Sequence, residues 1–226
     1  MKDRLYVALV FAAVAVMVVV VVVVLRVGQK DPSPPSLRDH PRPEIAGSIV
    51  YVDDEGCIQK LAASGAGPRE KVTCPGQPQA VTWVDAGTIA FSGPGTTRWI
   101  LVDLATKKET SGATSDPTKP FPFPREDVAS PRGERISIGS DGSVFRSNGE
   151  RVKIFTFDGP DNAQPMFATW SPDGEWVLLR YYRENELWIV RRDGSVAGTV
   201  TGGATGSASW WIDGSGYLPK VDGAVR

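Results

Sequence analysis

The chain has 226 residues, a formal net charge of −1 and 41% hydrophobic residues, which is enough for one folded domain with a core and additional segments. The near-neutral charge, without a long basic run, gives no reason to expect a nucleic-acid partner. A single histidine and two cysteines argue against Ser-His-Asp, Cys-His and zinc-based chemistry.

The N-terminus is hydrophobic. Residues 5–25 read LYVALVFAAVAVMVVVVVVVL and contain no charge. About 20 apolar residues in a helix span the roughly 30 Å hydrocarbon core of a bilayer. The run is longer than the apolar region of a cleaved signal peptide, and no cysteine follows it to carry a lipid anchor. We therefore expect a short tail over residues 1–4 and an uncleaved transmembrane helix, a signal anchor, over residues 5–27.

The charges around this helix give conflicting signals on its orientation. Four cations follow the helix and two precede it, so a plain positive-inside count keeps the C-terminal part in the cytoplasm. A long domain behind a very short tail is translocated largely regardless of charge. We expect a single-pass protein of the cell membrane whose C-terminal domain is extracytoplasmic.

Residues 28–44 form a proline-rich linker. The stretch DPSPPSLRDHPRPE over residues 31–44 offers almost nothing to bury, so we expect an extended, semi-rigid spacer. His40, the single histidine, lies in this spacer and has no fixed geometry there for a ligand role.

Residues 45–226 are predicted to be the folded domain. Their apolar residues come in short β-rich runs, which include SIVYV (48–52), WVLLRYY (176–182) and ELWIVRR (186–192). Glycine, aspartate and proline separate these runs, and no amphipathic helical period of useful length occurs. The pattern predicts an all-β domain with tight turns.

A repeat runs through this domain. The stretches TWVDAGTIAF (from Thr82), VASPRGERISI (from Val128), TWSPDGEWVLL (from Thr169) and SWWIDGSGYL (from Ser209) each carry a glycine four residues after an anchor position. The anchors are 46, 41 and 40 residues apart, a period typical of propeller blades. The positions assigned a structural role in this repeat are Trp83, Gly87, Gly133, Trp170, Asp173, Gly174, Trp210, Asp213 and Gly214.

The stretch over residues 170–194, WSPDGEWVLL followed by ELWIVRRDG, resembles the WD40-like repeat of TolB-type β-propellers. The resemblance is partial at SPRG (130–133) and weak in the first and last units. It covers about residues 45–226 and implies a propeller fold with an extracytoplasmic binding or scaffolding role and no catalysis.

About four units fit, complete or incomplete, at the lower end of the usual blade number. The N-terminal piece has inner strands without an anchor strand, and the C-terminal piece has an anchor strand with little after it. We expect the two ends to complete one blade.

Cys57 and Cys74 flank a predicted hairpin. Their midpoint falls between Gly65 and Ala66, so a turn there places the two cysteines opposite each other, where a disulfide is tolerated. Such a bridge indicates an oxidising compartment. The alternative is a pair of unrelated buried thiols.

Two groups of aromatic residues are candidates for partner binding. Phe121 and Phe123 lie in an expected inter-blade loop, and Tyr181, Tyr182 and Arg183 form a YYR stretch of the types that dominate interface hot spots. The alternatives are a loop packed by its own phenylalanines and cross-strand aromatic packing.

The sequence therefore predicts a membrane-anchored β-propeller domain that acts as a non-catalytic protein-binding or scaffolding module of the cell envelope. The partners expected are an envelope protein or another extracytoplasmic component, and the lipid bilayer through the N-terminal helix. No catalytic, cofactor-binding or metal-binding residue is assigned. The alternatives are a sensory domain that binds a small ligand in the channel, and a hydrolase or lyase that uses propeller carboxylates.

Overall fold

The computed structural model describes residues 34–93, 98–114, 129–139, 141–156, 165–181 and 185–214. These ranges belong to one compact unit that begins at Pro34, and they contain β-strands but no α-helix. The expected transmembrane helix over residues 5–27 lies outside them. Within the described residues, no helix is long and apolar enough to cross a membrane.

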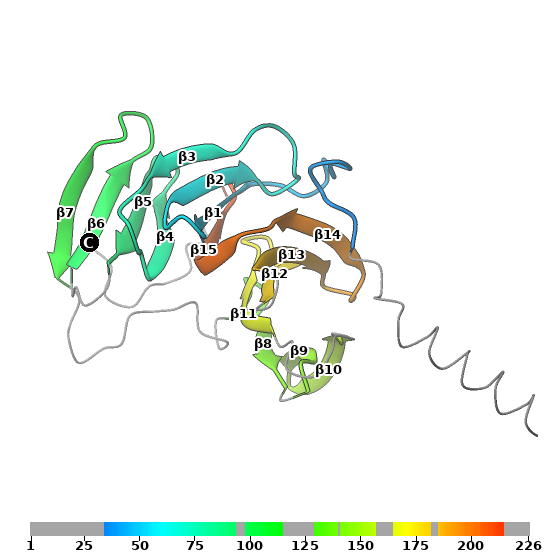
Figure 1. Ribbon diagram of the computed structural model, residues 1–226. Coiled ribbons are helices and arrows are strands. Elements are labelled where there is room, and N and C mark those ends of the chain that lie inside the picture. Colours follow the sequence, from blue (N-terminus) through cyan, green and yellow to red (C-terminus); the bar gives the residue numbers. More distant parts are fainter. Residues whose placement is uncertain are drawn as a thin grey trace, which may run out of the picture. The chain divides into compact units, whose positions relative to one another are not determined.

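The strands form four antiparallel sheets, most of whose strands follow one another along the chain (Figure 1). The first sheet has the order β15 (Ala204–Trp211), β1 (Ser48–Asp53), β2 (Ile58–Ala62) and β3 (Glu70–Thr73). The second contains β4 (Ala80–Asp85), β5 (Thr88–Ser92), β6 (Arg98–Asp103) and β7 (Glu109–Thr114). The third has the order β10 (Glu150–Phe155), β9 (Val144–Asn148) and β8 (Arg135–Ile138). The fourth contains β11 (Pro165–Trp170), β12 (Trp176–Tyr181), β13 (Glu186–Arg191) and β14 (Val196–Thr201).

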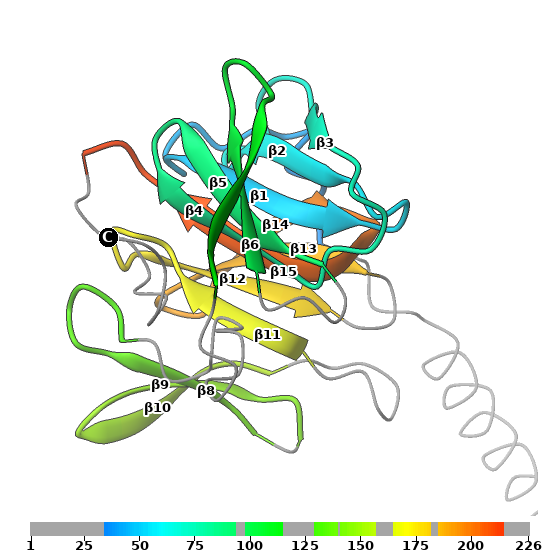
Figure 2. The ribbon, with the colours of Figure 1, turned by 90° about the vertical axis from the view of Figure 1, so that its left-hand side faces the viewer.

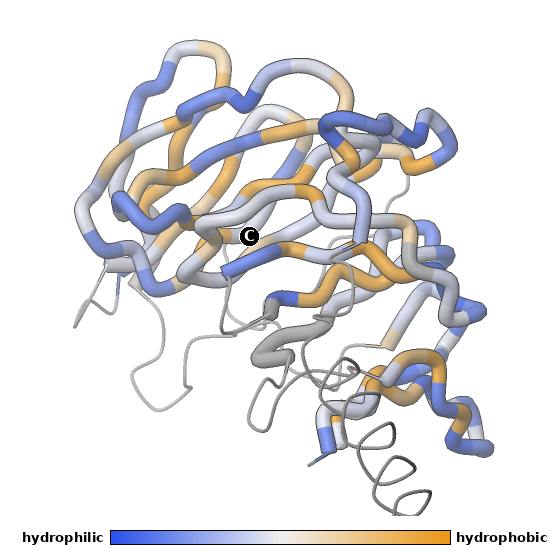
Figure 3. Tube along the Cα trace, turned by 45° about the vertical axis from the view of Figure 1, so that its right-hand side comes forward, coloured by the Kyte–Doolittle hydropathy of each residue, from blue (hydrophilic) through white to orange (hydrophobic). Residues whose placement is uncertain are grey.

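The central strands are apolar on both faces because neighbouring sheets pack against both. In β13, all four residues from Leu187 to Val190 are buried. A strand buried on one face only would alternate apolar and polar residues, whereas this one reads as a continuous apolar run. Figure 3 shows hydrophobic residues along many of the strands and hydrophilic residues at many of the connections.

The two ends of the domain complete one sheet, as the two incomplete sequence units predict. Strand β15 pairs antiparallel with β1, so that Ile49 lies opposite Trp210. Trp210 is buried, and its indole Nε1 donates a hydrogen bond to the carbonyl oxygen of Ala46 at 2.9 Å. Sheets of sequential strands, one of them closed by strands from both ends of the chain, make this a β-propeller-like architecture.

The sheets pack side by side through their first strands. Strand β4 lies beside β15, β15 beside β11, and β11 beside β8 (Figures 1 and 2). Apolar clusters fill the spaces between the second and first, the first and fourth, and the fourth and third sheets. Among the described strands, β4 and β8 have no contact of similar extent, so the second and third sheets stand at the two ends of the row.

The segment before β1 differs from the predicted spacer. Ser36 forms a parallel bridge with Thr199 of β14, and the Leu37 backbone N–H donates to the Thr199 carbonyl oxygen at 2.8 Å. The Leu37 side chain is only 1% exposed. The prediction that an extended linker continues to residue 44 is therefore wrong from Pro34 onward. Leu37 is buried in the core, and its backbone is hydrogen-bonded to β14.

Candidate functional site

The repeat tryptophans are packing residues. Trp83, Trp170 and Trp210 are buried at or near the ends of β4, β11 and β15. Trp83 donates from its indole Nε1 to the carbonyl oxygen of Ser209 at 3.2 Å, which joins the second sheet to the first. None of these three side chains is accessible to a ligand.

The repeat aspartates and glycines form turns. The Asp173 carboxylate accepts hydrogen bonds from the hydroxyl of Ser171 and from the backbone N–H of Glu175, and it therefore has a structural role. Gly174 has a φ of 71°, which favours glycine. The other members behave alike: left-handed φ values occur at Gly133 and Gly214, Asp213 accepts from the Trp211 indole, and the N–H of Gly87 donates to Asp85.

The predicted aromatic binding surface is largely outside the described residues. Phe121, Phe123, Tyr182 and Arg183 are not described. Tyr181 ends β12, where its backbone pairs with Pro165 and Glu186. The binding role of these residues therefore stays a prediction.

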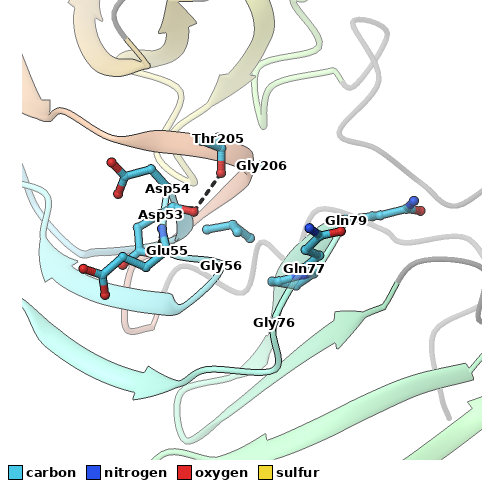
Figure 4. A pocket seen from close by; sticks show the side chains of 11 residues that line it. Asp53, Asp54, Glu55, Gly56, Gly76, Gln77, Gln79, Thr205 and Gly206 are labelled. Carbon is cyan, nitrogen blue, oxygen red and sulfur yellow. Dashed lines mark hydrogen bonds between the residues drawn. The ribbon is translucent and has the colours of Figure 1, made fainter.

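A cleft of about 610 Å³ opens between two connections of the first and second sheets and the first residues of β15 (Figure 4). One wall is the β1–β2 turn, which contains Asp53, Asp54 and Glu55. The facing wall is the β3–β4 connection with Gln77 and Gln79, and the start of β15 lines the remaining side.

Asp53 shapes the first wall. Its Oδ1 accepts hydrogen bonds from the backbone N–H groups of Glu55 and Cys57, at 3.1 and 2.8 Å. Its Oδ2 accepts from the side-chain amide of Gln59 at 2.7 Å. With its carboxylate occupied in this way, Asp53 fixes the turn, while the next two carboxylates, of Asp54 and Glu55, are exposed on the cleft wall (Figure 4).

A disulfide joins the two facing walls. Cys57 directly follows the first wall and Cys74 lies just before the second, and their sulfurs are bonded at 2.05 Å. Ile58 pairs with Thr73 in the adjoining strands, so the cysteines stand opposite each other, in the register that their spacing predicts. The bridge ties together segments that carry opposite sides of the cleft.

The two walls also touch through their backbones. Gly56 has a φ of 75°, and a Cβ placed on it would lie 1.6 Å from the carbonyl oxygen of Gly76. On the third side, the Thr205 hydroxyl donates to the carbonyl oxygen of Asp53 at 2.7 Å (Figure 4). A glycine contact, a hydroxyl bond and the disulfide therefore hold the cleft in a fixed shape.

Three potential ligand residues in the first wall do not form a metal site. The ligand atoms of Asp53, Glu55 and Cys57 lie within 4.8 Å of one another. The Cys57 sulfur is already bonded to Cys74, and both oxygens of Asp53 accept N–H donors. Without a thiolate or an unoccupied Asp53 oxygen, the cluster keeps only the Glu55 carboxylate for a cation.

A buried carboxylate between the third and fourth sheets was not predicted. Glu134 is 3% exposed and accepts hydrogen bonds from Arg146 at 2.8 Å and from two nitrogens of Arg192 at 2.7 Å. Hydrogen bonding from Arg192, the largest cause, and the hydrogen bond from Arg146 lower the pKa of Glu134. In the next unit, Glu175 directly follows the turn glycine Gly174, as Glu134 follows Gly133, and it pairs with Arg132. A glutamate after the turn glycine is therefore the sequence pattern that could have indicated these ion pairs. This network links two sheets and is structural.

No protein-family model matches the sequence, and a search of curated proteins finds no match. Among solved structures, the chain is similar to TolB from Acinetobacter baumannii, with 18% identity, a TM-score of 0.28, and coverage of 70% of this chain and 42% of that one. It is similar to the Cps50 (Swd1) β-propeller domain of Myceliophteria thermophila, with 14% identity, a TM-score of 0.26, and coverage of 68% and 56%. It is also similar to virginiamycin B lyase from Staphylococcus aureus, with 11% identity, a TM-score of 0.28, and coverage of 70% and 56%.

The chain spans 42 to 56% of the length of these three structures. The assignment of a propeller-like architecture rests on the order and closure of the sheets described above. The activities of the three proteins are their own, and one of the three is a lyase.

Proposed function

We propose that the chain is a membrane-anchored, extracytoplasmic, propeller-like module that binds a protein of the cell envelope without catalysing a reaction. The observation that carries this proposal is the cleft whose walls are joined by the Cys57–Cys74 disulfide. A structural disulfide persists in oxidising compartments, which supports a location outside the cytoplasm. The uncharged apolar run over residues 5–25 supports the anchor.

The cleft suits a polypeptide segment. Its volume is within the range of about 300–1,000 Å³ found for ligand sites. The amides of Gln77 and Gln79 each offer donors and an acceptor, which is what the peptide groups of an extended segment require. Because the walls are already fixed, a bound segment does not have to order them, and binding loses less conformational entropy.

Site-specific photo-crosslinking in intact cells tests this proposal. A photoreactive phenylalanine analogue in place of Gln77 places the probe on the cleft wall, whereas the same analogue in place of Glu109 places it on β7 of the second sheet. Both positions are exposed, so neither replacement disturbs the core. We expect a discrete adduct with an envelope protein from the Gln77 position and none from Glu109.

Equal adducts from both positions, or none from Gln77, would contradict cleft-mediated protein binding. A membrane-impermeant lysine reagent applied to the same cells tests the location separately. If Lys60 and Lys71 were labelled only after the cells were made permeable, the domain would face the cytoplasm.

A further inference from the structure

The third sheet has one apolar face that packs in the core and an opposite face made mostly of polar and charged residues. Its buried face carries Ile136, Val144 and Ile154, which pack against the fourth sheet. On the opposite face, strand alternation and register bring together six residues. Arg135, Ser147 and Arg151 form one cross-strand row, and Ser137, Phe145 and Lys153 form the next. We call these six residues the cationic face.

The three cations of this face are exposed and have no ion-pair partner among the described residues. Arg135, Arg151 and Lys153 are exposed, and none takes part in a salt bridge with another residue that the structure describes. Asp141 at the β8–β9 turn interacts with Lys153, whereas Glu150, which precedes Arg151 on β10, alternates onto the opposite face of the sheet. Two hydrogen bonds from Ser143 already occupy the Asp141 carboxylate. The face therefore carries three cations against the one carboxylate of Asp141, and among the described residues it keeps a net positive charge.

Arg151 is held by an aromatic ring. Its guanidinium carbon lies 3.6 Å from the centroid of the Phe145 ring, on the neighbouring strand. Stacking leaves the N–H edge of a guanidinium directed outward, where it can bind both oxygens of one carboxylate. The side chain thus loses little freedom when an anion binds.

The spacing of the cations fits an extended polypeptide. Arg151 and Lys153 are two residues apart on one strand, a distance of about 6.6 Å at 3.3 Å per residue. An extended segment has the same repeat, so acidic residues at alternate positions would meet both cations. Arg135 lies two strands away, about 9.5 Å across the sheet, and is positioned for a further carboxylate.

We propose that the cationic face is a docking surface for an extended acidic segment of a protein partner. Charge complementarity and the matching two-residue repeat carry this assignment. The face is on the third sheet, at one end of the row, whereas the cleft is formed by the first and second sheets (Figure 2). The two surfaces are therefore separate, and each can fail its test without the other.

A binding measurement with a synthetic acidic peptide tests the proposal. The full-length chain, in zwitterionic detergent micelles, is titrated into a fluorescein-labelled peptide of alternating glutamate and threonine, and fluorescence anisotropy is followed. The double variant Arg135→Gln with Arg151→Gln is expected to raise the dissociation constant about tenfold or more, because two charge-assisted contacts are lost. Arg151→Lys should give an intermediate effect, since it keeps the charge but loses the planar stack and the bidentate geometry.

The matched control removes the same charge elsewhere. Arg38→Gln with Lys108→Gln changes two exposed cations outside the third sheet and should leave the dissociation constant within about twofold of the wild-type value. Thermal unfolding of both double variants verifies that they are folded. If both variants weakened binding equally, the effect would be one of net charge and the proposal would be overturned.

Two further probes separate the acidic protein segment from other ligands. A peptide of alternating glutamine and threonine should not bind, and binding of that peptide would show that carboxylates are not what is recognised. Phosphatidylglycerol vesicles and a single-stranded oligonucleotide present phosphate instead. If the wild type bound either of these in an Arg151-dependent way but not the glutamate peptide, the face would recognise phosphate and a protein segment would be the wrong occupant.

Discussion

At the scale of single residues, Gly56 and Glu134 show how much the domain depends on positions that look ordinary in the sequence. Gly56 is one of many glycines next to an acidic residue, and Glu134 is one of three glutamates that follow a turn glycine. The structure places Gly56 against the backbone of Gly76 and buries Glu134 between two arginines. Both are open to direct tests.

Gly56→Ala should destabilise the domain by about 3 kcal/mol, because the new Cβ would overlap the Gly76 carbonyl oxygen and the backbone would remain at a left-handed φ. Gly67→Ala is the matched control. Gly67 also has a left-handed φ, of 80°, but a Cβ there meets no heavy atom within 4 Å, so the loss should be about 1 kcal/mol. Urea unfolding measures both, and equal losses would contradict the close approach.

Glu134→Gln should cost about 2 kcal/mol at neutral pH, because an amide group replaces a carboxylate oxygen that faces a guanidinium. Hydrogen bonds from Arg192 and Arg146 lower the folded-state pKa of Glu134. The stabilisation by this carboxylate is therefore fully present above the ordinary glutamate pKa and is lost as the pH falls through the lowered folded value. Urea unfolding of wild type and variant should converge in acid.

Glu175→Gln provides the comparison for this prediction. Its carboxylate also pairs with an arginine, Arg132, but its side chain is 38% exposed. An exposed pair contributes about 0–1 kcal/mol, so this variant should stay close to the wild type over the same pH range. If Glu175→Gln lost as much unfolding free energy as Glu134→Gln, burial of the carboxylate would not explain the stability that Glu134 provides.

At the scale of elements, the disulfide and the hairpin that it closes give a third prediction. Replacing Cys57 and Cys74 together with serine opens a loop with a sequence separation of 17 residues and should lower the unfolding free energy by about 3 kcal/mol. Because the bridge ties the cleft walls, the Gln77 photo-adduct should also weaken. Wild type treated with dithiothreitol should behave like the double variant, and unchanged stability in either sample would contradict the role of the bridge.

The sequence predicted those elements whose geometry is local. The fourth sheet follows from the turn after Trp170 and the apolar runs on either side, because hydrophobic period and Asp-Gly turns act over a few residues. The cysteine pairing follows from hairpin symmetry, because Ile58 and Thr73 beside the bridge pair in the expected register, although the register shifts by one residue from Gln59 onward.

Features that depend on contacts between distant segments could not be predicted. The cleft needs Thr205 beside Asp53, and no local pattern connects two such distant positions. Leu37 stands alone among prolines and charges, so nothing marks it as a core residue. The cationic face appears only once β8, β9 and β10 are in register, because its cations come from β8 and β10 and its aromatic ring comes from β9 between them.

At the scale of the whole molecule, Trp210 should be among the most sensitive positions. Trp210→Ala removes a side chain that is 2% exposed, together with its bond to Ala46, and should cost about 3–5 kcal/mol. Strand β15 also packs against β4 and β11, so we expect the loss to spread through the domain. Far-UV circular dichroism and tryptophan fluorescence should report one shared transition at a lower urea concentration.

Trp211→Ala is the control, because Trp211 is only partly buried and donates to Asp213 at the domain surface. Its loss should be clearly smaller than that of Trp210→Ala. If the two spectroscopic transitions of Trp210→Ala separated, the sheets would unfold independently and β15 would not couple them.

The pairing of β15 with β1 also means that the first sheet can be completed only after β15 has been synthesised. The ribosome makes β1 before the other described strands and β15 after them, so the edge of β1 that pairs with β15 stays unpaired until residues 204–211 have been made. Contacts of such long sequence separation slow folding, and an open strand edge invites pairing with the wrong chain. A nascent chain that stalls before Ala204 would thus expose an unpaired edge of β1 that can pair with another chain, and β15 covers this edge in the folded domain.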